Sequence, residues 1–288
     1  AAGLEVKVQR RVSKLIALFF FSLVSTGAFA APEQHEGVAV GKPSAMRKLV
    51  PAEGLERQAT QEFSQLKQEA AAKKALAPDD HPQTRRLRQI AARIIPHAAR
   101  FNSRAQQWQW EVILIGGQQV NAFCMPGGKI AVFSGLLLGL QLTDDEAAVV
   151  MGHEIAHALR EHARERIAKT ELTRLGASVL SEFVGGGKYS GLFSAGGQLM
   201  TLKFSRDDET EADTVGLELA ARAGYDPRAG ITLWKKMMAA NKGAPPQWLS
   251  THPSGKNRIG EIERHLPEVM PIYEKAKSQS RQDGGVQR

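Results

Sequence analysis

The chain is poor in cysteine, in aromatic residues and in long apolar runs. Its single cysteine, Cys124, excludes an internal disulfide, and no neighbouring histidine makes a recognisable Cys-His pair with it. We therefore expect Cys124 to pack as a small apolar residue and not to act as a nucleophile. Several glycines and Lys188 interrupt the apolar stretch 176–202, which favours two short helices there over a membrane span.

Aromatic residues make up 6% of the chain, and none is interleaved with its most basic segment. The net charge is +8, and much of the excess comes from six arginines between residues 85 and 104. On a helix these arginines do not form one stripe, so no nucleic-acid site is expected. We interpret them as solvated helix faces, although such a basic surface also favours peripheral association with an anionic membrane.

Residues 1–30 have the organisation of a secretory signal peptide. Four basic side chains lie between residues 7 and 14, an apolar run follows over 15–24, and Ala28-Phe29-Ala30 supplies a small-x-small cleavage site. The apolar run is too short for a comfortable transmembrane helix. A cleavable signal peptide is therefore predicted, with an uncleaved anchor as the alternative.

The remaining pattern predicts one mostly helical domain of the α+β class over 55–275. A flexible lead-in, 31–54, is expected before it and a polar, disordered tail, 276–288, after it. Strands are predicted over 108–114, 120–125 and 129–133, the last two forming a small antiparallel sheet edge. Helices are predicted over 55–76, 82–100, 134–142, 144–168, 207–222, 227–241 and 255–265.

The segment MGHEIAHA lies inside one of these predicted helices, which begins with a capping box at Thr143. His153 and His157 are one turn apart on the same face, so both imidazoles can reach one metal ion. Glu154 lies beside them, where a carboxylate can take a proton from a water activated by the metal. The alternative is a pair of core histidines that are hydrogen-bonded to the backbone.

A third ligand is expected from elsewhere, because catalytic zinc usually has three protein ligands and one open position. Glu209 and Asp213 share one face of a later predicted helix. Glu209 can bind the metal while Asp213 accepts a hydrogen bond from the free ring nitrogen of His153. The alternative is an ordinary acidic helix surface. We interpret the neighbouring acidic residues in that way: Asp207, Asp208 and Glu211.

These motifs, followed by Ser-Thr-His-Pro at 250–253, resemble the HtpX/BepA-type zinc metallopeptidase family. The pieces stand in the family's order at 153–157, 205–213 and 250–258. A fourth, 121–130, resembles the strand pair that precedes the family's active-site helix. The resemblance extends over residues 85–268 and implies a zincin-like metallopeptidase domain, mostly helical, with one zinc ion.

The resemblance also implies roles for single residues. His153, His157 and Glu209 match the zinc ligands, and Glu154 matches the general base. These four residues are the same ones that the helical spacing selects. The implied activity is therefore endopeptidase cleavage of peptide bonds.

The resemblance also places three further residues, of which His252 and Arg258 are assigned through it alone. His252 is placed near the metal, where it either supports the reaction as a catalytic residue or occupies the open metal position in a latent state. Taken without the resemblance, His252-Pro253 reads as a loop turn. Asp213 matches an acid behind a ligand histidine, and Arg258 is expected to orient its neighbours through ion pairs.

A protease of this kind must hold its substrate extended across the metal. The hairpin around 121–132 is the expected docking edge, with Asn121, Gly127 and Gly128 as substrate-binding residues. Backbone pairing tolerates many sequences, so the expected substrates are unfolded or misfolded polypeptides. The expected setting is protein quality control in the bacterial periplasm. The alternative function is a latent, metal-bound chaperone or assembly factor for envelope proteins.

Overall fold

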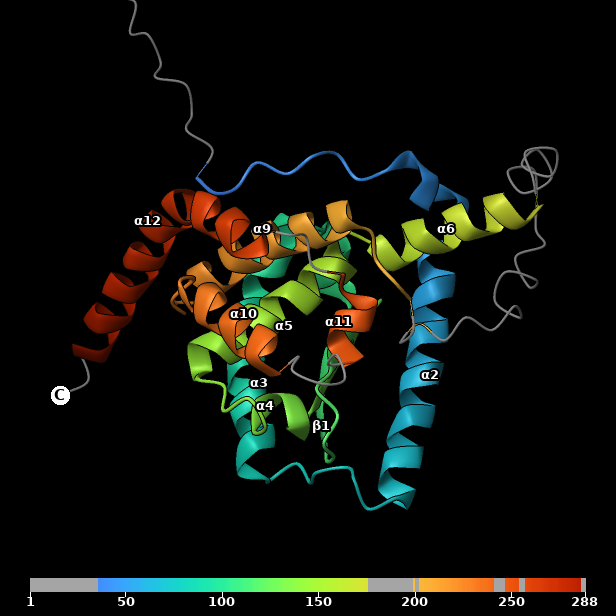
Figure 1. Ribbon diagram of the computed structural model, residues 1–288, viewed down its shortest axis with the longest axis horizontal. Coiled ribbons are helices and arrows are strands. Elements are labelled where there is room, and N and C mark those ends of the chain that lie inside the picture. The colour runs from blue at the N-terminus through green and yellow to red at the C-terminus, as the bar shows by residue number, and fades with distance from the viewer. Residues whose placement is uncertain (1–35, 176–198, 200–201, 241–246, 254–256, 286–288) are drawn as a thin grey trace, which may run out of the picture. The chain divides into compact units, whose positions relative to one another are not determined.

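The computed structural model describes residues 36–175, 199, 202–240, 247–253 and 257–285. The predicted signal peptide and nearly all of 176–202 lie outside the described residues. Helices surround a small sheet, which agrees with the predicted α+β class (Figure 1). Among the described helices, none combines the length and the apolar character that crossing a bilayer requires.

Most elements begin and end within a few residues of their predicted bounds. Three short helices among the described residues, η1, η3 and α11, have no counterpart in the prediction. The last helix, α12, continues beyond His265 to Gly285, so residues 276–285 of the predicted disordered tail are helical. In chain order the elements are η1 Ala45–Leu49, α2 Ala52–Ala72, α3 Pro82–Ile94, η2 Ile95–Arg100, η3 Ser103–Gln107, β1 Glu111–Ile115, β2 Ala122–Met125, β3 Lys129–Phe133, α4 Ser134–Leu137, α5 Asp144–Leu159, α6 His162–Leu175, α9 Arg206–Arg222, α10 Ala229–Ala240, α11 Gln247–Thr251 and α12 Arg258–Gly285, where η marks a 3₁₀ helix.

The sheet has three strands in the order β1-β3-β2. β2 and β3 form the predicted antiparallel hairpin, with Phe123 opposite Ala131. β1 pairs with β3 in parallel, with Ile113 opposite Ala131, so the sheet is mixed rather than wholly antiparallel. β3 is therefore central and buried along its whole length, whereas β2 is an edge strand.

Each face of the sheet packs against a different set of helices. Side chains alternate along β1, so Ile113 and Ile115 face α2 while Val112 and Leu114 face the opposite side. On the α2 side they meet the buried residues Leu55, Ala59 and Phe63. On the other side lies the larger apolar cluster, built with α3, α5 and α9. Figure 1 shows α2 on one side of β1, with α3 and α5 on the other.

The predicted helix 144–168 is two helices, which corrects the sequence prediction. α5 ends at Leu159, and α6 begins at His162. Between them Glu161 adopts a left-handed conformation with φ of 59°, which stops the helical path. Ion pairs from Arg47 and Arg164 hold the Glu161 carboxylate in place. No glycine lies between the two helices, so the apolar periodicity of the sequence predicts one continuous helix across the break.

The described part of the predicted lead-in makes specific contacts with the body. The backbone N–H of Val38 donates to Oε2 of Glu218 at 2.6 Å, and Glu218 is fully buried in α9. The guanidinium of Arg160 donates to the carbonyl of Gly41.

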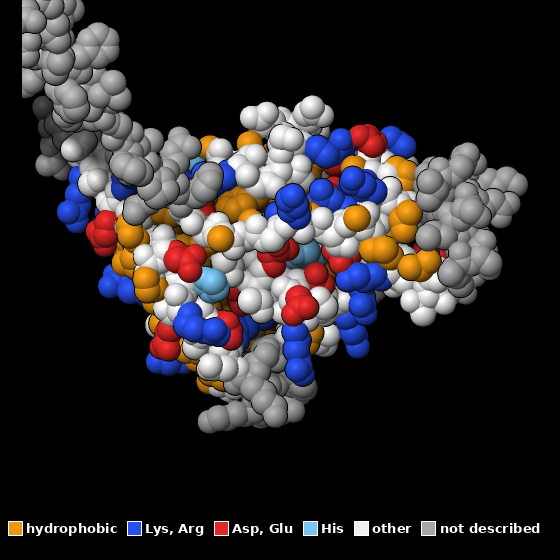
Figure 2. Space-filling view, turned by 90° about the horizontal axis from the view of Figure 1, so that it is seen from above, with side chains coloured by type: hydrophobic (Ala, Val, Ile, Leu, Met, Phe, Trp, Pro, Cys, Tyr) orange, Lys and Arg blue, Asp and Glu red, His pale blue; other side chains and the backbone are white. Residues whose placement is uncertain are grey.

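Most of the arginines between residues 85 and 104 have partners in the structure. Arg86 and Arg88 pair with Asp144 and Asp79, and Arg104 pairs with two glutamates of α2. On the face drawn in Figure 2, Lys and Arg side chains are interspersed with Asp and Glu. This mixture is typical of a solvated surface.

Candidate metal centre

Two helices bring the predicted motifs together. α5, which the capping box of Thr143 and Glu146 starts, carries the predicted His-Glu-x-x-His motif, and α9 carries Glu209. The helices cross at a pair of glycines: a Cβ on Gly152 would lie 2.7 Å from the carbonyl oxygen of Gly216. Only hydrogen fits at this crossing. The two helices therefore approach closely enough for Glu209 to reach the histidines.

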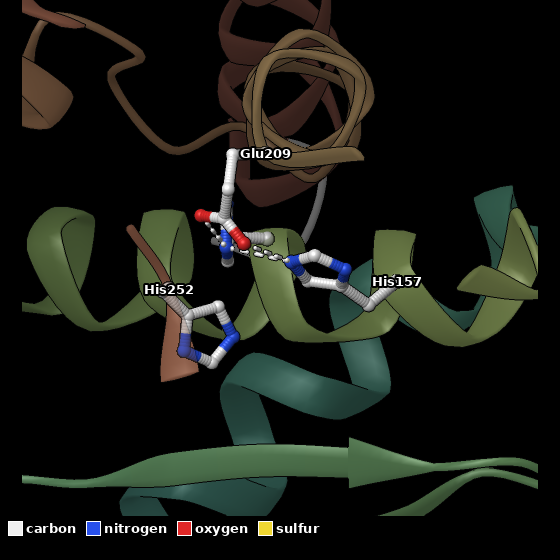
Figure 3. Close-up of side chains that lie close together, drawn as sticks. His157, Glu209 and His252 are labelled. Atoms are coloured by element: carbon white, nitrogen blue, oxygen red, sulfur yellow. Dashed lines mark hydrogen bonds and ion pairs between the residues drawn. The ribbon is translucent and has the colours of Figure 1, made fainter. Parts of the chain in front are cut away.

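Four buried side chains form one cluster: His153, His157, Glu209 and His252. One potential ligand atom from each lies within 4.8 Å of the others. The Nε2 atoms of His153 and His157 are 3.0 Å apart, and Oε1 of Glu209 is 3.3 Å from Nε2 of His157. In Figure 3 the Glu209 carboxylate extends from α9 toward α5, and His157 and His252 lie on either side of it.

The cluster has the features of a cation site. Glu209 Oε1 and His252 Nε2 are buried and have no hydrogen-bond partner among the described residues. Because Nδ1 of His153 faces the Asp213 carboxylate at 2.9 Å, its proton is assigned there, which leaves a lone pair on Nε2. A buried cation would satisfy all these groups at once, and two imidazoles with a carboxylate suit a divalent transition metal.

Asp213 and Arg258 form the support behind His153. Asp213 accepts hydrogen bonds from Nε of Arg258 at 2.5 Å and from Nη2 at 2.6 Å. The same guanidinium donates to Oε2 of Glu209 at 2.8 Å and lies over the Trp234 ring, 3.9 Å from its centroid. Arg258 therefore fixes both a candidate ligand and the carboxylate that orients another. Burial raises the pKa of Asp213, but the charge of Arg258 outweighs this and the net pKa is lowered.

Glu154 lies in the same buried region, on the side of His252. Its Oε1 accepts a 2.6 Å hydrogen bond from the indole nitrogen of Trp248, and its Oε2 is 3.5 Å from Nε2 of His252. Trp248 belongs to α11, stacks on His252 and is buried. Trp248 was not predicted as a site residue, because a lone tryptophan outside any motif carries no sign of its partner.

The pKa shifts fit a metal site with a nearby base. Burial, the largest cause, holds the pKa of His157 well below its usual value. His157 is therefore neutral at pH 7, the form that can bind a metal. Burial raises the pKa of Glu154, but the nearby charge of His252 outweighs it, and the net pKa is lowered. Glu154 is therefore ionised and able to accept a proton.

A second histidine lies behind His157 and was not selected from the sequence. Nδ1 of His162 is 2.9 Å from Nδ1 of His157, and Nε2 of His162 is 2.8 Å from Oε2 of Glu211. Glu211 also accepts a 2.6 Å hydrogen bond from Arg160. The interpretation of Glu211 as ordinary acidic surface is therefore wrong, because its carboxylate holds a buried imidazole. The break at Glu161, absent from the prediction, turns His162 back toward His157.

The three predicted substrate-binding residues lie at two different places. Asn121, immediately before β2, is buried and lines a narrow cavity of about 30 Å³ together with Glu154, His157 and His252. Gly127 and Gly128 lie in the turn between β2 and β3, outside the four-residue cluster, with φ of 83° and 80°. Glycine is favoured at both positions because the turn requires positive φ there.

The cysteine is also part of this region. Cys124 of β2 is half-buried, packs against the larger apolar cluster and lines the same narrow cavity. Burial raises the pKa of its thiol well above the ordinary value, so it is not a thiolate at neutral pH.

Known proteins share the part of the chain that builds this centre. Residues 81–266 match the model of peptidase family M48. The mitochondrial metalloendopeptidase OMA1 of Arabidopsis thaliana is 43% identical over 182 residues, which is 62% of this chain and 36% of that protein. Metalloprotease LoiP of Escherichia coli is 29% identical over 68% of this chain and 75% of its own length.

A third relative is the beta-barrel assembly-enhancing protease of Escherichia coli, 27% identical over 66% of this chain and 40% of that protein. The present chain thus spans less than half the length of this Escherichia coli relative and less than half the length of the Arabidopsis relative. The family match covers more than half of the present chain and includes every residue of the cluster. The matched family is broader than the HtpX/BepA-type group that the motifs resemble. The chain belongs to peptidase family M48.

Proposed function

We propose that this protein is a zinc-dependent endopeptidase that cleaves unfolded or misfolded polypeptides. The observation that carries the proposal is the buried cluster in which His153, His157, Glu209 and His252 converge, with Glu154 beside it. In this proposal His153, His157 and Glu209 hold one zinc ion. Two histidines with one carboxylate are a usual catalytic ligand set, whereas structural zinc sites are mostly closed by cysteine and histidine.

Residues around the proposed zinc site have separate roles in this reaction. Bound zinc supplies Lewis acidity, which polarises a carbonyl group and makes water more acidic. Glu154 accepts the proton of the attacking water and then passes a proton to the leaving amine. Trp248 holds the Glu154 carboxylate in a fixed orientation through its indole N–H. Asp213 and Arg258 hold His153 and Glu209 in the geometry that binds the metal.

The proposed substrate lies extended along β2, the edge strand nearest to the centre. Residues of β2 and Asn121 before it line the cavity that also contains Glu154 and His157. An edge strand offers unpaired backbone groups, and an added strand would pair with them regardless of its sequence. Native proteins rarely offer a free extended segment, so unfolded or misfolded chains are the proposed substrates.

We place this activity in protein quality control of the bacterial envelope, in the periplasm. Two observations support the placement: the signal-like sequence of residues 1–30, and the similarity to the beta-barrel assembly-enhancing protease. Other relatives are named as mitochondrial proteins, and this setting is said of them alone. The basic balance of the chain also supports peripheral contact with an anionic membrane.

We further propose that the resting protein is closed by His252. The cavity beside the cluster measures about 30 Å³, room for about one water molecule and none for a peptide. His252 Nε2 has no hydrogen-bond partner among the described residues and is close enough to the other three groups to act as a fourth ligand. The same closure favours one alternative function, a metal-bound assembly factor for envelope proteins with weak or conditional proteolysis.

Cleavage of casein, an unfolded protein, by the zinc-loaded chain tests the proposal. Glu154→Gln serves as the matched variant, and the zinc content of both proteins is measured. Cleavage by the wild type alone, at equal zinc content, supports the endopeptidase and its base. Equal cleavage by both would exclude Glu154 as the base. Retained zinc without cleavage by either protein would favour the assembly factor.

A further inference from the structure

The two candidate ligand histidines of α5 are supported in different ways. Nδ1 of His153 meets a carboxylate directly, that of Asp213 at 2.9 Å. Nδ1 of His157 meets a second imidazole, that of His162, also at 2.9 Å. A carboxylate also supports His157, but only through His162, because Oε2 of Glu211 lies 2.8 Å from Nε2 of His162. An arginine fixes each carboxylate: Arg258 holds Asp213, and Arg160 holds Glu211.

The hydrogen-bond directions along this second support follow from the geometry. Nε2 of His157 faces the cluster, so it presents its lone pair there and carries its proton on Nδ1. That N–H donates to Nδ1 of His162, which must therefore accept. The proton of His162 then lies on Nε2, where it faces the Glu211 carboxylate. Every donor thus meets an acceptor from His157 to Glu211.

This chain of contacts is buried and held at both ends. The side chains of His157 and His162 are both almost fully buried, and that of Glu211 is 25% exposed. Arg160 is buried and donates to both Glu211 and the carbonyl of Gly41. Asp208 adds negative charge 3.9 Å from His162 Nε2. A buried imidazole in such a frame has little freedom to turn.

We propose that His162 is a positioning residue for the metal site. Its hydrogen bond fixes the orientation of the His157 ring, and Glu211 in turn fixes the orientation of His162. The inference rests on the proposed ligation by His157. A group that hydrogen-bonds to the free nitrogen of a ligand histidine fixes the orientation of the ring. Loss of such a group typically weakens metal binding by about 10- to 100-fold. His162 touches no atom of the four-residue cluster except through His157, so its effect is on metal binding and not on the proton transfer.

The test measures zinc retention by the zinc-loaded protein in competition with a chromophoric chelator, together with thermal unfolding. His162→Leu removes both hydrogen bonds, and we expect zinc to bind about 10- to 100-fold more weakly. His162→Gln keeps an acceptor and a donor at similar positions, and we expect it to restore most of the affinity. Asp207→Asn, an exposed neutralisation on the same helix as Glu211, is the control and should leave affinity unchanged.

Glu211→Gln tests the outer half of the chain and keeps His162 in place. We expect weaker zinc binding from this change alone, and no further loss when it is added to His162→Leu, because both act through one path. Two results would overturn the inference: unchanged affinity in His162→Leu, or equal losses in His162→Leu and His162→Gln. If His162→Leu does not fold, unchanged affinity in Glu211→Gln overturns it.

The assay also separates this inference from the proposed function. A wild-type protein that does not bind zinc would overturn both. A wild type that binds zinc and cleaves casein, with a His162→Leu variant of equal affinity, would overturn the positioning role alone.

Discussion

The indole N–H of Trp248 donates a 2.6 Å hydrogen bond to Oε1 of Glu154, while the face of the same ring stacks on His252 at a centroid distance of 4.7 Å. One buried side chain of α11 thus contacts both the proposed base and the proposed fourth ligand. α11 is in turn tied to the segment just before β2, because the backbone N–H of Trp248 donates to the carbonyl of Val120. Small shifts of α11 would therefore alter Glu154 and His252 together.

Trp248→Phe is expected to lower kcat about tenfold or more with zinc content unchanged. The change keeps most of the aromatic packing and removes one hydrogen bond to a carboxylate, which is worth about 1.5–3 kcal/mol. KM should change little, because the indole N–H faces Glu154 and not the proposed substrate edge. The measurement is steady-state cleavage of a peptide beside a zinc assay. An unchanged kcat would show that Glu154 keeps its orientation without Trp248.

The same variant should shift the acid limb of the pH profile of kcat/KM to higher pH. A hydrogen bond to the ionised carboxylate lowers its pKa, and Trp248 is one of the groups that do so for Glu154. Removing the donor therefore raises the pKa of Glu154, so the base becomes protonated at a higher pH. Initial rates across the acid range check this, with Trp234→Phe as the control at a neighbouring tryptophan. A shift to lower pH would contradict the assignment.

His252→Ala is expected to raise turnover of unfolded substrates, because it opens the fourth position at the metal. Zinc should remain bound through the other three groups, with an affinity reduced by the loss of one ligand. Turnover and zinc content are measured together, and His265→Ala on the surface of α12 is the control. A fall in turnover at full zinc occupancy would show instead that His252 supports the reaction.

Gly216→Ala is expected to destabilise the fold by about 1–3 kcal/mol, the usual cost of overpacking, and to weaken zinc binding. The added Cβ would lie 2.7 Å from the backbone nitrogen of His153, so α5 and α9 must separate. Gly230→Ala is the control, since its Cβ would meet only side-chain atoms at 3.4 Å or more. Thermal unfolding and chelator competition measure the two effects. Equal stability of the two variants would contradict the close crossing.

Glu146→Gln is expected to lower the free energy of unfolding at pH 7, by about 1 kcal/mol, the size of an ordinary hydrogen-bond contribution. Burial raises the pKa of Glu146, but Lys236, the Thr143 amide and Thr232 outweigh it and the pKa lies below 4.5. The ionised carboxylate therefore stabilises the fold fully above pH 4.5, and this contribution is lost as the pH falls through the lowered pKa.

Denaturant titrations of wild type and Glu146→Gln at several pH values measure this contribution as a difference. Their stabilities should converge as the pH is lowered below 4.5. A gap that widens toward acid pH would contradict the sign of the shift.

The sequence was sufficient for the parts of the site that depend on one helix. The spacing of His153 and His157 and the capping box at Thr143 are local features, and the structure has both as predicted. The spacing of Glu209 and Asp213 on α9 is local as well. Their convergence with α5 was expected because catalytic zinc usually has a third protein ligand, and the resemblance to a known family supported it. No local pattern states which helices meet.

The parts that were missed depend on contacts between segments distant in sequence or on an unmarked backbone turn. Trp248 acts on Glu154 across 94 positions, and nothing around it indicates a polar partner. His162 was hidden because the helical pattern continues through Glu161, a residue that adopts positive φ without being glycine. The parallel pairing of β1 with β3 was likewise invisible, because alternation predicts a strand but not its neighbour.

The helix α2 precedes residue 81, where the match to the peptidase family begins, yet it packs against one face of the sheet. The bounds of the family match are therefore not the bounds of the folding unit. A chain trimmed at residue 81 would present Ile113, Phe123 and Phe133 to solvent beside the edge strand β2. Such a surface invites self-association. A segment outside the family match thus covers apolar surface of the matched part, and we expect its removal to promote self-association.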